Sequence, residues 1–462
     1  MTSLRRPRTL STLIALLAVA AVARAVVALL TAVPSRDATH YLFLAERAVD
    51  GEPAELFRSV FHPGFPLLIA AVLPIFPGLA PFRAGQAASA GAGVLAVVPL
   101  FFLARRLTDQ RGAVWTCLMY AVGTWFCRHP ADVLSEGPFY LCVAAWGERL
   151  VGPASTARAT AAGLLAALAY ACRPEGALLV VVASCWLWAH RSRTAAVAAA
   201  AAFCIAAAPL PAGWALWGDG FTLTPKAAFN LEVGIGSAEH GAWSHYAGEL
   251  TRLPGALCEG IGFAAFPLAL IGAVSARRRT PLGDWRVLLL APLAAQCAVV
   301  PMLQSHHRFL TGFGVLTLPF AAHAVLWVAH RMHGKPIRAA LAGCAFLGLD
   351  LARLPQSRGE ERRIERALGA WLAARLHPGE QVASDMPRLV YFAGRRPPQP
   401  RRIPGAQVLR EARRPEVRVI ALVRSRTSVP DEALRQLGFA PLELPEPLRR
   451  QADARDVAVF GR

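Results

Sequence analysis

Long apolar runs follow one another along the chain as far as about residue 355, and only short polar stretches separate them. A helix that crosses a bilayer needs about 20 mostly apolar residues. By that measure the pattern predicts about eleven spanning helices, over 9–33, 84–104, 112–128, 133–150, 159–172, 175–190, 193–217, 254–275, 286–305, 309–330 and 336–354. The pattern therefore predicts an all-α polytopic membrane domain.

One further apolar run, 63–80, contains prolines at four positions and is predicted to lie along the membrane surface as a juxtamembrane helix. Proline removes a backbone donor and disfavours a continuous helix. Arginines before the first helix place the N-terminus in the cytoplasm, and a run at 63–80 that does not cross keeps the later arginine clusters on that side. The loops 34–83 and 218–253 are then predicted to face outward.

The pattern changes after about residue 356, where helix and strand signals alternate. Apolar positions recur at helical spacing in 360–376, and short strand-like runs follow at 381–384, 417–423 and 456–460. This alternation is typical of a small α/β domain. We therefore predict two domains, a transmembrane domain over 1–355 and a small extracytoplasmic domain over 356–462.

The composition agrees with a membrane protein. Hydrophobic residues make up 55% of the chain and charged residues 17%, whereas soluble proteins carry about 25% charged residues. Lysine and arginine outnumber aspartate and glutamate by 49 to 30, which gives a net charge of +19. So apolar a composition excludes a soluble enzyme. In a membrane protein the excess of positive charge indicates the orientation of the loops, and it therefore does not favour nucleic-acid binding. The nine cysteines all lie in apolar runs and indicate neither disulfides nor a CxxC metal site.

The first predicted outer loop carries the clearest candidate chemistry. It opens at Ser35-Arg36-Asp37 and continues to Phe61-His62-Pro63-Gly64. A carboxylate at the point where a helix leaves the bilayer could act as a general base on an attacking hydroxyl. Aspartate is equally suited to capping the helix that follows. The spacing alone leaves both interpretations of Asp37 open.

The loop resembles that of a known family. The pattern of Asp37, Tyr41, Ala45 and Gly51, followed by the segment His62-Pro63-Gly64-Phe65-Pro66-Leu67, is similar to the first outer loop of the C-type (GT-C) glycosyltransferases. The resemblance is to the family 39-like group of protein O-mannosyltransferases and the lipid A aminoarabinose transferase. Further family-like features are Ser135-Glu136, Arg173-Pro174-Glu175-Gly176, His306-His307-Arg308-Phe309, Trp371-Leu372, Ser384-Asp385 and Tyr391-Phe392-Ala393-Gly394.

This resemblance implies a function and a mechanism. It implies a polyprenyl-phosphate sugar donor, transfer with inversion at the anomeric carbon, and Asp37 as the base. The chain departs from many relatives at Ala38, where they have an acidic residue, and at Gly64, where they have a second proline. The second departure leaves His62 as a titratable group that could orient the donor or the acceptor.

A negatively charged donor also needs cations, and arginine suits bidentate phosphate contacts. The candidates are Arg308, Arg173 and Arg36. For Arg308 the alternative is a cation that snorkels at the interface. For Arg173 the alternative is a local ion pair with Glu175, which contributes little energy.

Three more residues are candidates for acceptor or metal contact: Glu136, Tyr41 and His307. Glu136 opens a predicted helix, where an acid also interacts favourably with the helix dipole. A divalent cation held by Asp37, His62, Glu136 and His129 is chemically plausible, but the spacing requires none. The aromatic residues Trp214, Trp217, Trp243 and Tyr246 are predicted to form an interfacial belt.

We therefore expect a multi-pass glycosyltransferase of the cytoplasmic membrane, with its N-terminus inside and its C-terminal domain outside. Its partners would be a polyprenyl-phosphate sugar and membrane lipid, and not nucleic acid. The alternative is a secondary transporter or flippase, which usually shows paired repeats and charges at mid-membrane. A polytopic scaffold is the third hypothesis. The sequence does not identify the sugar, the acceptor, any metal or the oligomeric state.

Overall fold

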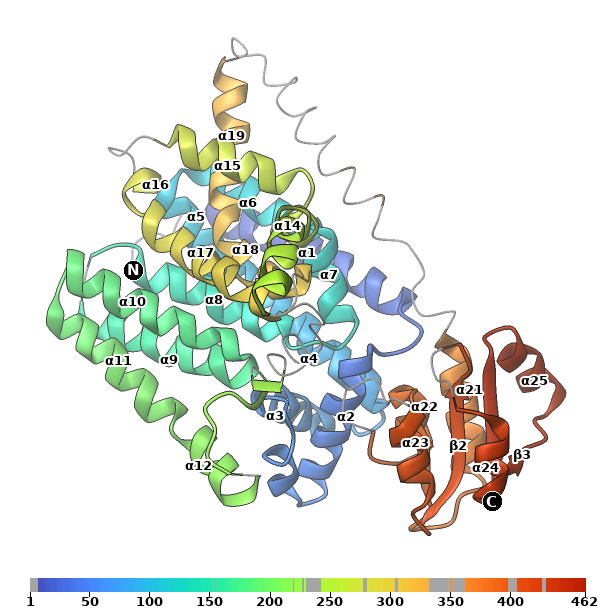
Figure 1. The fold of residues 1–462 in the computed structure, drawn as a ribbon. Coiled ribbons are helices and arrows are strands. Elements are labelled where there is room, and N and C mark those ends of the chain that lie inside the picture. Colours follow the sequence, from blue (N-terminus) through green and yellow to red (C-terminus); the bar gives the residue numbers. More distant parts are fainter. Residues whose placement is uncertain are drawn as a thin grey trace. The chain divides into compact units, whose positions relative to one another are not determined.

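The computed structural model describes residues 7–153, 155–218, 220–226, 228–229, 242–276, 281–303, 306–331, 348, 352, 362–397, 405–425 and 429–462. The chain forms two compact units. The first comprises Met1–Leu29 and Arg47–Gln356, and the second comprises Leu30–Glu46 and Ser357–Arg462. Figure 1 shows the ribbon with its element labels, and each unit is described by itself.

The first unit is built from helices. They are α1 (Pro7–Leu30), η1 (Pro53–Leu56), α3 (Gly64–Val72), η2 (Leu73–Ile75), α4 (Pro81–Leu95), α5 (Val97–Leu107), α6 (Gln110–Val122), α7 (Thr124–Ala131), α8 (Glu136–Leu150), α9 (Thr156–Cys172), η3 (Pro174–Gly176), α10 (Ala177–His190), α11 (Arg193–Ala207), α12 (Pro209–Trp217), α14 (Ala242–Ile261), α15 (Ala265–Ser275), α16 (Pro281–Asp284), α17 (Arg286–Leu303), α18 (His307–Gly314), η4 (Val315–Thr317) and α19 (Leu318–Arg331).

Five helical stretches in the described residues are long and apolar enough to cross a membrane: Thr9–Leu30, Pro81–Leu107, Arg193–Trp217, Arg286–Leu303 and His307–Arg331. A sixth arises if the bent pair α14 and α15 counts as one span. Other predicted spans are shorter helices, such as Thr156–Cys172 and Pro174–His190. The helix predicted over 336–354 lies almost wholly outside the described residues.

The span predicted over 254–275 is broken in the structure. Helices α14 and α15 meet there at 99°. Gly262 lies between them with a φ of +120°, a backbone conformation that glycine adopts readily and most other residues avoid. The apolar run continues through this bend, so hydrophobicity alone does not mark it.

The proline-rich run at 63–80 forms a short helix, Gly64–Ile75. Its 12 residues extend about 18 Å at 1.5 Å per residue, whereas the apolar core of a bilayer is about 30 Å thick. This helix is therefore too short to cross a membrane by itself, in agreement with its prediction as a juxtamembrane element.

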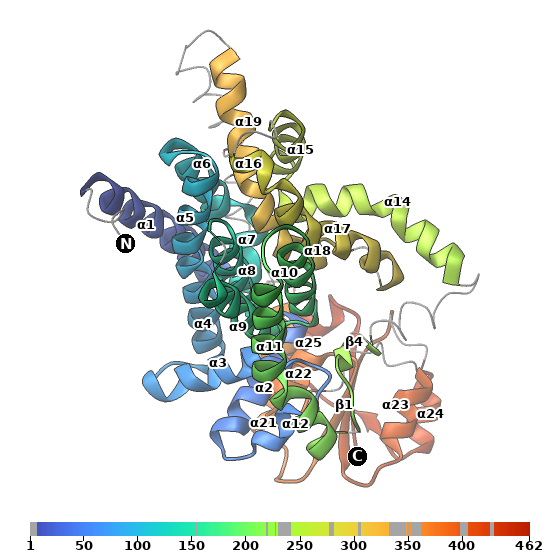
Figure 2. The ribbon, with the colours of Figure 1, turned by 90° about the vertical axis from the view of Figure 1, so that its left-hand side faces the viewer.

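Small residues set the spacing of the helices. Helices α9, α10 and α11 lie side by side in both views (Figures 1 and 2), and α9 packs against α11 along its length. A Cβ atom added at Gly163 of α9 would lie 2.2 Å from the Ala199 carbonyl oxygen of α11. Close approach through glycine and alanine is typical of helix packing in membranes, where dispersion contacts replace the hydrophobic drive.

The second unit contains a four-stranded sheet in the order β1-β2-β4-β3. Its strands are β1 (Gln381–Ser384), β2 (Val417–Val423), β3 (Ala440–Pro441) and β4 (Val457–Gly461). Strand β1 pairs with β2 in parallel, and the other pairs are antiparallel. The prediction of a small C-terminal α/β domain is confirmed, and only the two-residue strand β3 lacked a sequence signal.

Helices pack on both faces of this sheet. They are α21 (Arg363–Ala373), α22 (Pro387–Phe392), α23 (Gly405–Ala412), α24 (Asp431–Gln436) and α25 (Glu446–Asp453). Side chains of β2 alternate between the two faces. Val419 and Ala421 join a core with α21, α22 and α25, whereas Ile420 and Leu422 join a core with α23 and α24.

Candidate functional site

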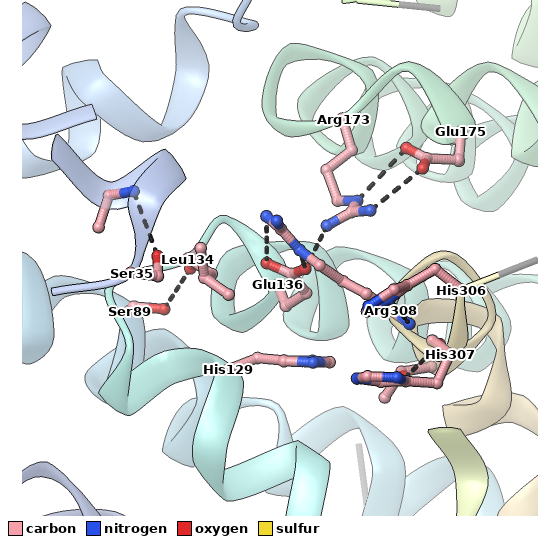
Figure 3. Close-up of polar contacts among 12 residues, drawn as sticks. Ser35, Ser89, His129, Leu134, Glu136, Arg173, Glu175, His306, His307 and Arg308 are labelled. Carbon is pink, nitrogen blue, oxygen red and sulfur yellow. Dashed lines mark hydrogen bonds and ion pairs between the residues drawn. The ribbon is translucent and has the colours of Figure 1, made fainter. Parts of the chain in front are cut away.

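A buried carboxylate, Glu136, joins two arginines in the first unit (Figure 3). Glu136 is the first residue of α8 and is fully buried. Its Oε1 lies 2.5 Å from Arg173 Nη1, and the same oxygen accepts a hydrogen bond from Arg308 Nε. Arg308 Nη2 lies 3.4 Å from the other carboxylate oxygen. The acid at the start of the predicted helix is thus the centre of an ion-pair network.

Arg173 reaches this network from the end of α9. Pro174 follows it and disfavours the helical conformation at the preceding residue, and Arg173 accordingly has extended backbone angles. Its Nη2 donates to Glu175 Oε1 at 3.1 Å, and its Nε donates to Glu175 Oε2 at 3.3 Å. The local pair considered from the sequence therefore exists, but Arg173 also pairs with Glu136.

Arg308 enters from the N-terminus of α18. The His306 side chain caps this helix by accepting a hydrogen bond from the Arg308 backbone N–H at 3.2 Å. The helical stretch continues to Arg331 and is among the candidate membrane spans. The Arg308 side chain retains 18% of its exposure, against 1% for Glu136. Arg308 is therefore the most accessible member of the network, at a helix end that favours anions.

Imidazole and indole rings stack beside this network. The rings of His129 and His307 are nearly parallel, with centroids 5.8 Å apart. Trp125 lies 3.9 Å from the His307 ring. His129 Nδ1 hydrogen-bonds to the Tyr140 hydroxyl at 2.9 Å, and His307 Nδ1 lies 3.4 Å from Glu259. The close-up shows His129 and His307 next to the Glu136 network (Figure 3).

His62 occupies a second buried position in the first unit. Its Nδ1 lies 2.7 Å from the Tyr170 carbonyl oxygen, so the proton is on Nδ1 and the other nitrogen is an acceptor. The Tyr170 and Trp214 rings pack edge-on against it at 5.1 and 5.2 Å. Nε2 is buried and has no hydrogen-bond partner in the described part of the chain. It is therefore available to accept a hydrogen bond from a ligand.

This environment makes one aromatic prediction wrong. Trp214 is 1% exposed and packs against His62, so it does not belong to an interfacial belt. Trp217 and Trp243 do stand exposed, at 47% and 84%. Of the two tryptophans near the end of α12, Trp214 is therefore buried against His62 and Trp217 lies at the surface.

Burial lowers the pKa of His62 to about 4, against the opposing effects of the Tyr170 hydrogen bond and Glu175. In the unfolded chain the ring takes up a proton below pH 6.5, and the folded state resists that proton until about pH 4. Folding stability should therefore fall as the pH drops through this window, by about 2 kcal/mol between pH 7 and pH 5.

Between pH 7 and pH 5, we expect the thermal midpoint of unfolding to fall less in His62→Gln than in the wild type, because glutamine does not titrate. The measurement is thermal unfolding in detergent at both pH values. His377→Gln removes an exposed histidine and should leave the wild-type slope unchanged. Equal slopes for His62→Gln and the wild type would contradict the buried, neutral ring.

The remaining predicted residues belong to the second unit. Arg36, Asp37 and Tyr41 lie on α2 (Arg36–Val49). The Ser35 hydroxyl accepts a hydrogen bond from the Ala38 backbone N–H at 3.2 Å, so Ser35 performs the capping task considered for Asp37. Asp37 lies in the first turn and is half-buried, and Tyr41 follows it by one turn on the same face.

The predicted candidates therefore separate into three groups. Glu136, Arg173 and Arg308 form one network with His307 beside it, His62 lies in its own aromatic pocket, and the α2 residues belong to the second unit. No group of three or more His, Cys, Asp or Glu side chains that could bind a metal ion occurs within the described ranges.

Sequence reasoning missed Lys226 and Trp125. The Lys226 Nζ lies 4.3 Å from the centroid of the Phe61 ring. Phe61 is the residue before His62 in the sequence. Lys226 is one of two lysines in the chain, and this rarity within a predicted outer loop was a usable signal. Trp125 lies in an apolar run without any distinguishing neighbour, so no sequence signal marked its stacking on His307.

No protein-family model and no curated protein matches the sequence, but solved structures do match the fold. An oligosaccharyltransferase from Archaeoglobus fulgidus, in complex with zinc and sulfate, matches with a TM-score of 0.62 and 15% identity, over 87% of this chain and 67% of that one. ArnT from Cupriavidus metallidurans, bound to undecaprenyl phosphate, matches with a TM-score of 0.61 and 14% identity, over 97% of both chains.

A third match is the Archaeoglobus fulgidus oligosaccharyltransferase AglB in complex with an inhibitory peptide and a dolichol-phosphate. Its TM-score is 0.58 at 13% identity, over 88% of this chain and 69% of that one. At these identities the matches establish a shared fold. They confirm the fold that the sequence resemblance implied.

Proposed function

We propose that this chain, a multi-pass membrane protein with the GT-C fold, is a glycosyltransferase. It moves a sugar from a polyprenyl-phosphate-linked donor to an acceptor hydroxyl on the outer face of the cytoplasmic membrane. The observation that carries the proposal is the Glu136 network, in which Arg308 is held at a helix N-terminus and remains partly exposed. Two of the solved structures with this fold contain undecaprenyl phosphate or dolichol-phosphate.

The reaction breaks the bond between the anomeric carbon and the phosphate oxygen and forms a bond from the acceptor oxygen to the same carbon. The polyprenyl phosphate leaves with the bonding electrons, and Arg308 stabilises its developing charge. Asp37 takes the acceptor proton as general base, and attack from the opposite face inverts the anomeric centre. His62 contributes an acceptor nitrogen that can orient a sugar hydroxyl.

Glu136 has a positioning task in this mechanism. A carboxylate between two guanidinium groups is held in its charged form and is a poor base. Its contribution is to fix both arginines before the donor binds, which reduces the ordering cost on binding. Arg173, which also pairs with Glu175, adds a second positive charge beside Arg308. Arg36 of the second unit is a further candidate for phosphate contact.

Replacing Arg308 tests donor binding directly. We expect Arg308→Gln to raise the KM for a polyprenyl-phosphate sugar at least about tenfold, because a charge-assisted hydrogen bond contributes about 1.5–3 kcal/mol. Arg308→Lys should recover part of this loss, since it restores the charge without the planar fork. The measurement is a donor titration with purified protein in lipid nanodiscs.

Arg435→Gln provides the matched control. Arg435 is a 59% exposed arginine that pairs with the 71% exposed Glu432 one turn away, and its replacement should leave the donor KM within about twofold, since exposed pairs contribute little. An unchanged KM in Arg308→Gln would remove Arg308 from the donor site.

A further inference from the structure

Helix α22 of the second unit contacts the segment that carries Asp37. Arg388 Nε donates a hydrogen bond to the Pro34 carbonyl oxygen at 2.7 Å, and the arginine side chain is 9% exposed. Asp37 follows Pro34 by three residues, within one helical turn. A charged hydrogen bond at a buried carbonyl fixes where the segment enters α2.

The Arg388 guanidinium is itself fixed. Its Nη1 lies 3.0 and 3.2 Å from the two carboxylate oxygens of Glu365 on α21. Glu365 is also largely buried, at 12% exposure. Because the guanidinium is planar and rigid, the Glu365 contact sets the direction in which Nε points towards Pro34.

A second contact lies one turn further along α22. The Tyr391 hydroxyl donates to Glu46 Oε1 at 3.2 Å, near the C-terminal end of α2. Burial raises the pKa of Tyr391, and the Glu46 carboxylate adds to this, so the hydroxyl remains a donor at neutral pH. Arg388 and Tyr391 are three residues apart and share one face of their helix.

The two contacts bracket the Asp37 segment. Pro34 and Glu46 lie on either side of Asp37, and the helix between them is about 15 Å long at 1.5 Å per residue. Contacts at both ends restrain the helix against sliding and against rotation, which a single contact would permit. Residues 30–46 accordingly cluster with the C-terminal domain.

We infer that the C-terminal domain positions the general base: Arg388 and Tyr391 hold the Asp37 helix, and the rate of sugar transfer depends on that hold. The inference rests on the proposed function for its catalytic part only. Arg388 is a positioning residue that touches no reacting atom. A displacement of about 1 Å in a reacting group can lower the rate of catalysis by a factor of about 100.

The test compares Arg388→Ala with Arg414→Ala, which removes an exposed arginine of the same domain that pairs with Glu411 at the surface. Hydrogen–deuterium exchange over residues 35–46 measures how firmly Arg388 and Tyr391 restrain the Asp37 helix. The values of kcat and donor KM measure the effect of that restraint on sugar transfer. We expect exchange in this segment to accelerate at least about tenfold in Arg388→Ala, as the loss of a buried charged hydrogen bond implies. Exchange in α9 and all values for Arg414→Ala should stay at wild-type levels.

The kinetic arm separates positioning from binding. In Arg388→Ala we expect kcat to fall at least about tenfold while the donor KM stays within about twofold, since the lost contact orders the base and not the donor. Arg388→Lys should recover part of both effects. If Arg388→Ala does not fold, Tyr391→Phe removes only the second contact and should give the same pattern with a smaller amplitude.

Unchanged exchange over 35–46 in both Arg388→Ala and Tyr391→Phe would overturn the inference. Faster exchange with an unchanged kcat would also overturn it, because the hold would then have no effect on the reaction. A wild-type protein that transfers no sugar would instead contradict the proposed function, and the exchange measurement would still decide whether the domain holds the helix.

Discussion

Asp37→Asn is expected to reduce sugar transfer about a thousandfold or more while leaving the thermal midpoint of unfolding within about 2 °C of the wild type. Asparagine has the same shape as aspartate but cannot take the proton of an acceptor hydroxyl. Its effect on folding should be small because Ser35 supplies the N-terminal capping bond of α2. The measurement is transfer of labelled sugar from a polyprenyl-phosphate donor, with thermal unfolding as the check on folding.

The matched control is Asp50→Asn. Asp50 lies just beyond the same helix, is 60% exposed and is 3.8 Å from Arg47. Its replacement should leave transfer within about twofold of the wild type, because so exposed and distant a pair contributes little. Wild-type transfer by Asp37→Asn would remove Asp37 from catalysis and leave only a structural role for it.

Glu136→Gln is expected to cause a large loss of stability, about 3–5 kcal/mol. Glu136 is fully buried between Arg173 and Arg308, so its replacement leaves buried positive charge with less compensation. The thermal midpoint in detergent should fall by several degrees. The transfer activity that remains should show a raised donor KM, because the arginines lose their common anchor.

Two comparisons make this prediction specific. Glu446→Gln removes a carboxylate that pairs with Arg450 at 58% exposure, and it should change stability by less than about 0.5 kcal/mol. The double variant Glu136→Gln with Arg308→Gln should lose less stability than the two single variants added together, by about 1 kcal/mol or more. Strict additivity would show that the two side chains do not interact.

The sequence predicts the helices and strands better than the contacts between residues that lie far apart in the chain. The apolar runs locate the long helices and the alternating tail locates the α/β domain, because both signals depend on local burial. The Arg173–Glu175 pair is also local. The contact between Glu136 and Arg308 joins residues 172 positions apart, and no periodicity or spacing carries that information.

The residues around His62 show the same limit. The sequence marks His62 through its proline-rich surroundings, but Trp214 and Tyr170 come from α12 and α9. Tryptophan near the end of an apolar helix commonly lies at the membrane interface, and only the packing of distant helices makes Trp214 a buried support. The hold of Arg388 on Pro34 spans 354 positions and belongs to the same class of contact.

The most direct test of the central claim is a transfer assay with the purified protein in proteoliposomes that contain labelled polyprenyl-phosphate sugars. The proposed function predicts that the wild type breaks the sugar–phosphate bond of at least one donor and releases polyprenyl phosphate, whereas Asp37→Asn does not. Movement of the intact donor between the leaflets, with the sugar–phosphate bond unbroken for every donor, would contradict it and identify the protein as a transporter.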